Sequence, residues 1–365
     1  MTATDAEIVP GAGENGRRPP GRWRRRFGGA LAVLCGAYLV LVVAVWLTLR
    51  FAADRWWPGT LLMFGPRWVW GLPLAVLVPA ALLLRRWRLL VPLAVGAGVW
   101  LGPVIGLCVP WRTAPARGGD AGARPLRVLT CNADGGALEP AALDAFVKQC
   151  SPDVIVVQSP AQSDRNLFAS RPGWRSVQGL SYWLAVREPI AVGHVAEIED
   201  ADTGKGDAGP VATVYRLETP AGPVALANVH LATPRVALEA LIRRDRRVAE
   251  LTRRNVASRR RQFEALARWA EGAGGQVIMA GDFNTPPESA LFRDHLPGYA
   301  DAFSAAGFGA GNTYFTRRSG MRIDHVLAGA GWEARRCVVG PDVGSAHRPL
   351  VADLYPVARP PPARQ

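Results

Sequence analysis

Two polar side chains, Asp282 and Asn284, follow a short apolar run in the segment between Val277 and Pro287. The run predicts a buried strand, and Gly281 lets the backbone turn so that both side chains project from the end of that strand. A carboxylate accepts hydrogen bonds and a carboxamide can also donate them, which suits a site that orients a water molecule and holds an anionic oxygen. A strand followed by an Asx-type turn without any chemical role is the alternative interpretation of this segment alone.

Polar residues also follow other predicted strands. Asn132 and Asp134 follow the first strand of the region, His230 closes an apolar run, Asp324 lies in Arg-Ile-Asp-His, and His347 lies in Ser-Ala-His-Arg-Pro. A single histidine after an apolar strand is more often structural than functional. However, strand ends are where α/β proteins place their chemistry, so we expect these ends to meet in one site.

Three of these stretches form motifs that occur in order: Gly281 to Asn284, Arg322 to His325, and Ser345 to Pro349. In this order, and after His230, they resemble the signatures of the endonuclease/exonuclease/phosphatase superfamily, the DNase I-like fold. The resemblance covers residues 126–356. Apolar segments before that region, together with the run from Asn228 to Arg235, are similar to the membrane-tethered branch of the superfamily.

The resemblance implies metal-dependent hydrolysis of a phosphate ester. A phosphodiester is negatively charged and repels hydroxide, so a divalent ion and cationic donors must neutralise charge while a base aligns the water. Asp282 would orient or deprotonate that water, and Asn284 would hold a phosphate oxygen. His230 and His347 would donate hydrogen bonds to the phosphate, with Asp324 fixing the tautomer of His347.

The resemblance also implies where an ion and a substrate would bind. Asn132 and Asp134 would lie beside Mg²⁺ or Mn²⁺, ions that prefer oxygen ligands. Arg235 would join His230 and Asn284 in binding the phosphorylated substrate.

Two departures from the family pattern weaken the expected metal site. The family places a metal-binding glutamate after Leu-Gln, where this chain has Ser159, and it reads Ser-Asp-His where this chain has Ala346 before His347. Losing two carboxylates removes negative charge that offsets the desolvation of Mg²⁺, so we expect weak binding or binding through the substrate's own oxygens. A degenerate relative that binds a phosphorylated ligand without turnover, and an extracytoplasmic nuclease, are the alternatives.

Residues 126–356 read as an α/β domain. Residues 141–150 and 234–271 predict helices, the second in two halves separated at Asn255. Many short strands with few helices predict two stacked β-sheets flanked by helices, a four-layer α/β/β/α sandwich. The strands are expected at residues 126–130, 154–157, 181–186, 211–217, 224–230, 277–280, 323–327, 334–339 and 350–354.

Three apolar segments precede this domain, at residues 28–49, 67–84 and 89–110, and each is near the ~20 residues that cross a bilayer as a helix. They predict a membrane anchor over residues 28–110. A cleaved signal peptide is the competing interpretation of the first segment, but that segment is too long and no small-residue cleavage site follows it. The remaining parts are expected to be a basic N-terminus (1–27), a flexible linker (111–125) and a disordered tail (357–365).

The net charge of +13 is concentrated around the apolar segments, because residues 1–125 carry +10 and the rest of the chain carries +3. Arginines at residues 17–26 and 85–88 indicate that these parts face the cytoplasm, which leaves the domain extracytoplasmic on a multi-pass cell-membrane protein. Phosphorylated small molecules or lipids are then the expected substrates. The arginine-rich region 234–271 could attract anionic lipid or nucleic acid, although a solvated face is the simpler explanation and nucleic acid is not favoured.

Three cysteines, Cys131, Cys150 and Cys337, lie in the predicted domain. Their spacing matches neither a zinc site nor a disulfide framework. At most one bridge could form, and buried free thiols are equally compatible with the sequence.

Overall fold

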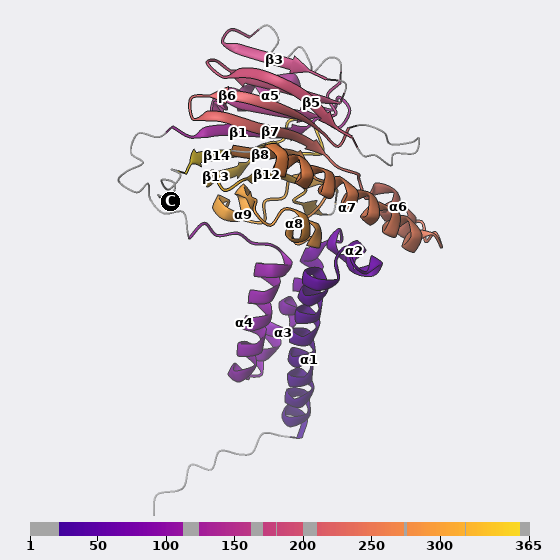
Figure 1. Ribbon diagram of the computed structural model, residues 1–365. Helices are drawn as coiled ribbons and strands as arrows, with labels where there is room; N and C mark the ends of the chain where they lie inside the picture. The colour runs from indigo at the N-terminus through magenta and orange to yellow at the C-terminus, as the bar shows by residue number, and fades with distance from the viewer. Residues whose placement is uncertain are drawn as a thin grey trace, which may run out of the picture.

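The computed structural model describes residues 22–111, 124–161, 171–179, 181–199, 210–273, 276–317 and 319–357. Most of the predicted basic N-terminus, nearly all of the predicted linker and the predicted tail after residue 357 lie outside these ranges. Figure 1 shows a stalk of helices beneath a sheet-rich domain. The apolar segments and the α/β region of the sequence thus form separate parts of the molecule.

Two six-stranded sheets form the centre of the domain. Their strand orders are β13-β14-β1-β2-β4-β3 and β5-β6-β7-β8-β12-β9, and β10 pairs with β11 separately. The strands are β1 (Leu126–Asn132), β2 (Val154–Gln158), β3 (Trp174–Gln178), β4 (Tyr182–Arg187), β5 (Ala191–Ile198), β6 (Ala212–Thr219), β7 (Gly222–His230), β8 (Gln276–Asp282), β9 (Ala300–Asp301), β10 (Tyr314–Phe315), β11 (Gly320–Met321), β12 (Asp324–Ala328), β13 (Trp332–Val339) and β14 (Leu350–Pro356).

Successive side chains of the central strands supply two different cores, because they point to opposite faces of a sheet. Val128 of β1 and Ile278 of β8 pack between the two sheets. Their neighbours Leu129 and Met279 face outward, Leu129 toward α5 (Pro140–Cys150) and Met279 toward α7 (Val248–Ala273). The predicted four-layer sandwich is therefore confirmed. The domain also contains α6 (Arg235–Ile242), α8 (Ala290–His295) and α9 (Ala302–Ala306).

Several elements differ from the sequence prediction. β3 and β5 lie at sheet edges and are mostly exposed or half-buried, so they lack the apolar pattern that marks a buried strand. β9, β10 and β11 have only two residues each. The helical region 234–271 is indeed divided, but the break falls between Ile242 and Val248, where Arg244 adopts a positive φ of 56°, and not at Asn255.

The stalk contains the apolar segments. The helix Arg26–Ala52, which includes most of α1 (Arg22–Leu47), has 27 residues, and the helix Trp87–Val104 around α4 (Leu90–Val99) has 18. Both are long and apolar enough to cross a bilayer. α2 (Trp57–Met63) and the stretch Arg67–Leu83, which includes α3 (Leu72–Leu83), would make a third span only as a pair bent by 88°. Three spans were predicted, but α2 was not.

Buried polar contacts dock the stalk on the domain. Asp54, just beyond α1, accepts a hydrogen bond from Nη2 of Arg259 on α7 at 2.9 Å, and both side chains are essentially inaccessible to solvent. Oγ of Ser289 donates to the other oxygen of Asp54. Arg67 binds Glu288 through two hydrogen bonds of 2.6 and 2.8 Å. The domain is therefore packed against its stalk instead of hanging from it by a linker alone.

The cysteines of the chain are all free. Cys131 and Cys337 are buried and Cys150 is half-buried. The one bridge that the sequence left open is therefore not formed.

Candidate active site

Strand ends from both sheets meet at one edge of the sandwich. β1 and β2 run parallel, with Asn132 paired to Gln158, and β7 and β8 run parallel, with His230 paired to Asp282. β12 runs antiparallel to β8 and begins with Asp324 opposite Asp282. Register places His230, Asp282 and Asp324 side by side in one sheet, and the packing of the two sheets adds Asn132, which is 192 positions from Asp324 in the sequence.

Close approach of β7 and β8 depends on Gly281. Its φ is 151°, and a Cβ at this position would lie 2.0 Å from the carbonyl oxygen of Val229 on β7. Any side chain would push the two strands apart. The glycine thus keeps His230 beside Asp282.

Asp282 is the centre of a buried hydrogen-bond cluster. Its Oδ1 accepts the backbone N–H of Asn284 at 2.8 Å, and its Oδ2 accepts Nδ2 of Asn132 at 2.9 Å and Nδ2 of Asn284 at 3.2 Å. Burial raises the pKa of Asp282 and the charge of Asp324 raises it further, while His347, His230 and the bond from Asn284 oppose the rise. The carboxylate is therefore fixed in orientation and more basic than a solvated aspartate.

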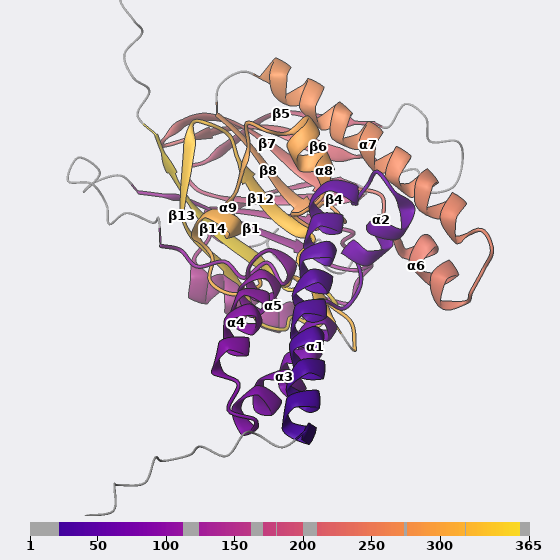
Figure 2. The same ribbon diagram turned by 90° about the horizontal axis from the view of Figure 1, so that it is seen from below.

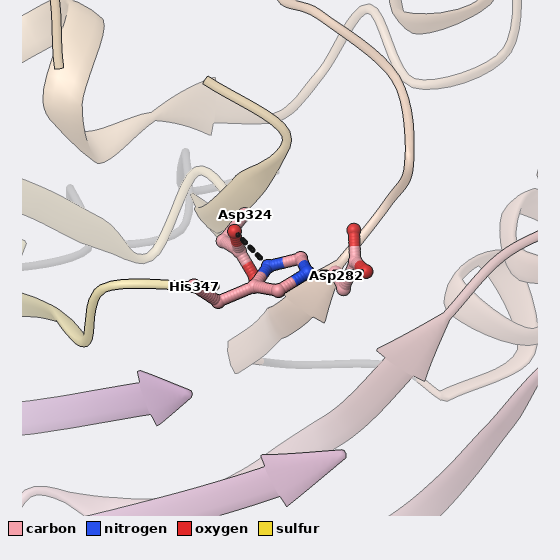
Figure 3. A group of neighbouring side chains, drawn as sticks. All are labelled: Asp282, Asp324 and His347. Atoms are coloured by element: carbon pink, nitrogen blue, oxygen red, sulfur yellow. Dashed lines mark hydrogen bonds and ion pairs between the residues drawn. The ribbon is translucent and has the colours of Figure 1, made fainter. Parts of the chain in front are cut away.

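His347 and Asp324 form a hydrogen-bonded pair beside Asp282 (Figure 3). Nδ1 of His347 lies 2.9 Å from Oδ2 of Asp324, and its Nε2 lies 3.9 Å from Oδ2 of Asp282. Burial opposes protonation of His347, but the charge and hydrogen bond of Asp324 and the charge of Asp282 outweigh it and raise the pKa to about 9. This raised pKa favours the imidazolium at neutral pH, and Nε2 of the ring faces Asp282 (Figure 3).

Asp282, Asp324 and His347 have ligand atoms close enough together to surround one ion, all within 4.8 Å of one another. Two of these side chains are also hydrogen-bonded to each other, since Nδ1 of His347 lies 2.9 Å from Oδ2 of Asp324. This bond fixes the orientation of the imidazole beside Asp282.

His230 lies on the other side of Asp282. Its Nε2 is 3.6 Å from Oδ2 of Asp282, and its Nδ1 is 3.3 Å from Oγ of Ser159. Ser159 follows β2 with a positive φ of 46°. The residue that replaces the expected glutamate is therefore inside the site, whereas Ala346, the other departure, is half-buried and does not line the cavity.

A cavity of about 490 Å³ contains these groups. Its polar lining comprises Asn132, Asp134, Ser159, His230, Arg235, Asp282, Asn284 and His347. Phe64, Leu238, Ile242 and Met321 give it an apolar part. All the residues predicted for the site thus line one cavity, except Asp324, which is fully buried and reaches it through His347.

Two residues that line the cavity, Tyr314 and Phe64, belong to no recognisable motif in the sequence. Tyr314 packs its ring on His347, with the ring centroids 4.9 Å apart, although it belongs to a strand of only two residues. Phe64 reaches the cavity from the stalk, directly after α2. Its place depends on how the stalk docks, which local sequence does not encode.

The side-chain oxygens of Asn132 and Asp134, which line the cavity, suit a hard cation. Oδ1 of Asn132 accepts the backbone N–H of Asp134 at 2.9 Å, and the Asp134 side chain is exposed. Oxygen donors of this kind fit Mg²⁺ or Mn²⁺. With Ser159 instead of a carboxylate, the donor set fits a weakly held ion.

We expect Asp324→Asn to lower the pKa of His347, because it removes the carboxylate that raises it most. In the native chain the imidazole signal of His347 should titrate near pH 9 in an NMR titration of the chain in lipid nanodiscs, and in the variant at lower pH. Since this pKa exceeds the ordinary histidine value of 6.5, the pair stabilises the fold fully below about pH 6.5, and that contribution is lost as the pH rises through about 9.

The matched control for this titration is Asp342→Asn, which removes an exposed carboxylate that pairs with Arg348. It should leave the signal of His347 unchanged. An unshifted signal in Asp324→Asn would contradict the assigned role of the His347–Asp324 pair.

The sequence matches the model of the Endonuclease/Exonuclease/phosphatase family over residues 129–347. Comparison with curated proteins finds no match.

Solved structures share the fold at low sequence identity. An endonuclease/exonuclease/phosphatase family protein from Bacteroides thetaiotaomicron is 15% identical, with a TM-score of 0.50 and alignment over 65% of this chain and 99% of that one. The human nocturnin catalytic domain with bound sulfate is 17% identical, with a TM-score of 0.47 over 63% and 94% of the two chains. A mannosyl-6-phosphatase from Bacteroides thetaiotaomicron is 16% identical, with a TM-score of 0.47 over 63% and 99%.

Proposed function

The chain belongs to the endonuclease/exonuclease/phosphatase family, and from this premise we propose that it is a membrane-anchored hydrolase of a phosphodiester or pyrophosphate substrate. Members of the family are typically metal-dependent phosphoester hydrolases. The observation that carries the proposal is the position of Asp282, a buried carboxylate of raised pKa between two imidazoles. A base flanked by proton donors meets the needs of water attack on an anionic phosphate.

Different residues deprotonate the water and stabilise the phosphate. Asp282 takes the proton of the attacking water, and its raised pKa makes it a stronger base for that step. His347 is already protonated and donates its Nε2–H to the phosphate, while Asp324 keeps it charged and oriented. His230 donates a hydrogen bond to the phosphate from the other side of Asp282.

Asn284 is better placed to orient Asp282 than to bind phosphate. Its amide group donates one hydrogen bond to the carbonyl of Leu231 at 2.8 Å and one to Asp282 at 3.2 Å. Both amide hydrogens are thus in use, and the predicted bond to a phosphate oxygen would require one of these bonds to break. Arg235, exposed at the cavity and without an acidic partner among the described residues, is the more available cation for the substrate.

Asn132 and Asp134 would hold a divalent ion, Mg²⁺ or Mn²⁺, which when bound would neutralise negative charge on the phosphate. Ser159 supplies no charge to this ion. Metal affinity in the absence of substrate is therefore expected to be low.

The arginine distribution supports an orientation with the N-terminus in the cytoplasm and the domain outside it. The cavity combines polar groups with the apolar side chains of Phe64, Leu238, Ile242 and Met321. Such a lining suits an amphiphilic phosphoester, for example a phospholipid or a lipid-linked pyrophosphate.

A metal titration of the full-length chain against a panel of phosphodiesters, pyrophosphates and nucleic acids tests the proposal. Turnover should require the ion, and Ser159→Glu should increase the affinity for Mn²⁺, measured by calorimetry, by about tenfold, or roughly 1.4 kcal/mol. Ser159→Gln is the control, because it adds nearly the same volume without the charge.

Three outcomes of this titration separate the alternatives. Ligand binding that survives a chelator, with no turnover by either the native chain or Ser159→Glu, would support a non-catalytic phospholigand-binding protein. Turnover of nucleic acid alone would support a nuclease. Equal metal affinities for Ser159→Glu and Ser159→Gln would show that position 159 does not face the ion.

A further inference from the structure

The face of the domain next to the stalk carries exposed apolar side chains on two sides. On α6, Val236, Leu241 and Ile242 are exposed, Ile242 by 80% of its surface, and Phe308 after α9 is exposed by 76%. Single exposed apolar residues are common on soluble domains. Here they gather beside a stalk that is itself apolar.

Direct contacts place both groups next to the stalk. Leu238 of α6 packs against the apolar core of the stalk, to which Phe64 belongs. Gly309, next to Phe308, exchanges backbone hydrogen bonds of 2.8 and 3.0 Å with Cys108, shortly beyond the end of the second apolar helix at Val104. Viewed from the stalk side, α2 and α6 lie on one flank of α1 (Figure 2).

The level of the bilayer surface follows from the stalk. The first apolar helix ends at Ala52, and α2 follows at an angle of 88° to the stretch that contains α3. α2 therefore runs along a bilayer that the stalk crosses, and the exposed Trp56 before it is typical of the interface. Figure 1 draws α6 on the same side of the stalk as α2, near the level at which α1 ends.

A basic turn follows the apolar residues of α6. In this turn, Arg243 pairs with Glu239 and Arg247 with Asp245. Arg244 is exposed and has no ion pair with any acidic side chain of the described ranges, and the same is true of Arg246. An apolar helix face beside unpaired cations is the pattern of a segment that lies in the interface of an anionic membrane.

We propose that α6 and the turn Arg243–Arg247 insert into the headgroup region of an anionic bilayer, with Phe308 contacting it on the other side of the stalk. This contact rests on the anchoring part of the proposed function and not on turnover. Because Leu238 and Ile242 also line the cavity, the cavity then opens at the lipid surface.

Spin labels test the contact in the full-length chain, reconstituted in nanodiscs of phosphatidylcholine and phosphatidylglycerol. The label is placed at Ile242→Cys in a background with the half-buried thiols removed by Cys108→Ser and Cys150→Ser. Ile242 is exposed, so the substitution leaves the fold intact. Collision with a water-soluble nickel complex should be several-fold lower at position 242 than at a control label, and collision with oxygen should be higher.

Val195→Cys is the control position, because Val195 is exposed by 41% and belongs to β5, a strand that Figure 1 draws well above the stalk. A label at Phe308→Cys should behave like the label at position 242. Nickel accessibility at 242 and 308 equal to that at 195 would overturn the proposal. Phosphoester turnover of the unlabelled native chain in nanodiscs of the same lipids reports separately on the proposed function, so the two can fail independently.

Discussion

Replacing Asp282 by asparagine should lower the turnover number by about 10²–10⁴-fold, the range expected for loss of a general base. The carboxamide cannot take a proton from water. Its NH2 group also replaces one of the two carboxylate oxygens and therefore faces a donor, either the backbone N–H of Asn284 or Nδ2 of Asn132. The loss should appear in initial rates at saturating metal, with the phosphodiester or pyrophosphate that the native chain turns over.

Thermal unfolding of the Asp282→Asn variant controls for damage to the fold. Its midpoint should stay near that of the native chain, because removing a buried charge offsets part of the lost hydrogen bonding. Asp342→Asn, at an exposed carboxylate, should keep full activity. Activity of Asp282→Asn within tenfold of native would rule out Asp282 as the base.

Arg259→Ala should have the largest effect on stability, with a loss of about 3–5 kcal/mol in the free energy of unfolding. Arg259 is fully buried and donates to Asp54, Asn255 and Thr285 at 2.9, 3.1 and 3.1 Å. Its removal leaves the carboxylate of Asp54 buried without a cation. Denaturant unfolding of the domain in nanodiscs measures the loss.

Two variants separate the ion pair from other effects. Arg260→Ala removes an exposed neighbour on the same helix and should change stability by less than about 0.5 kcal/mol. The double variant Asp54→Leu with Arg259→Met removes both charges and should regain most of the loss. If the double variant were as unstable as Arg259→Ala, the packing of the guanidinium and not its pairing would be the cause.

The contacts of Arg259 between the stalk and the domain also extend to the candidate active site. Thr285, which accepts a hydrogen bond from Arg259, directly follows Asn284, and its carbonyl contacts Nε2 of His325 at 2.9 Å. The turn that holds Asp282 is therefore braced from the stalk side. Arg259→Ala should lower activity as well as stability.

Sequence could predict the sandwich and the polar strand ends because each has a local pattern. An apolar run ending in Gly281-Asp-Phe-Asn284 marks both a strand and the side chains beyond it, and parallel neighbours bring such ends together. The edge strands β3 and β5 have no such pattern, because mostly exposed or half-buried residues need not be apolar.

The contacts between the stalk and the domain could not be predicted from local sequence patterns. Asp54 reads as a loop residue after an apolar helix, and Arg259 as one arginine in a basic helix. Only the packed structure shows that they are partners and that Phe64 lines the cavity. The use of both amide hydrogens of Asn284 inside the protein is likewise a property of geometry and not of sequence.

Asp54 and Arg259 are 205 positions apart, and this separation orders events during biosynthesis. At about 5–20 residues per second, a ribosome finishes Arg259 roughly 10–40 s after Asp54. Until then Asp54 lacks the cation with which it pairs in the folded chain, and α7 cannot dock on the stalk. The domain therefore completes its folding against a stalk that was synthesised first, so an error in inserting the stalk into the membrane would also disturb the candidate active site.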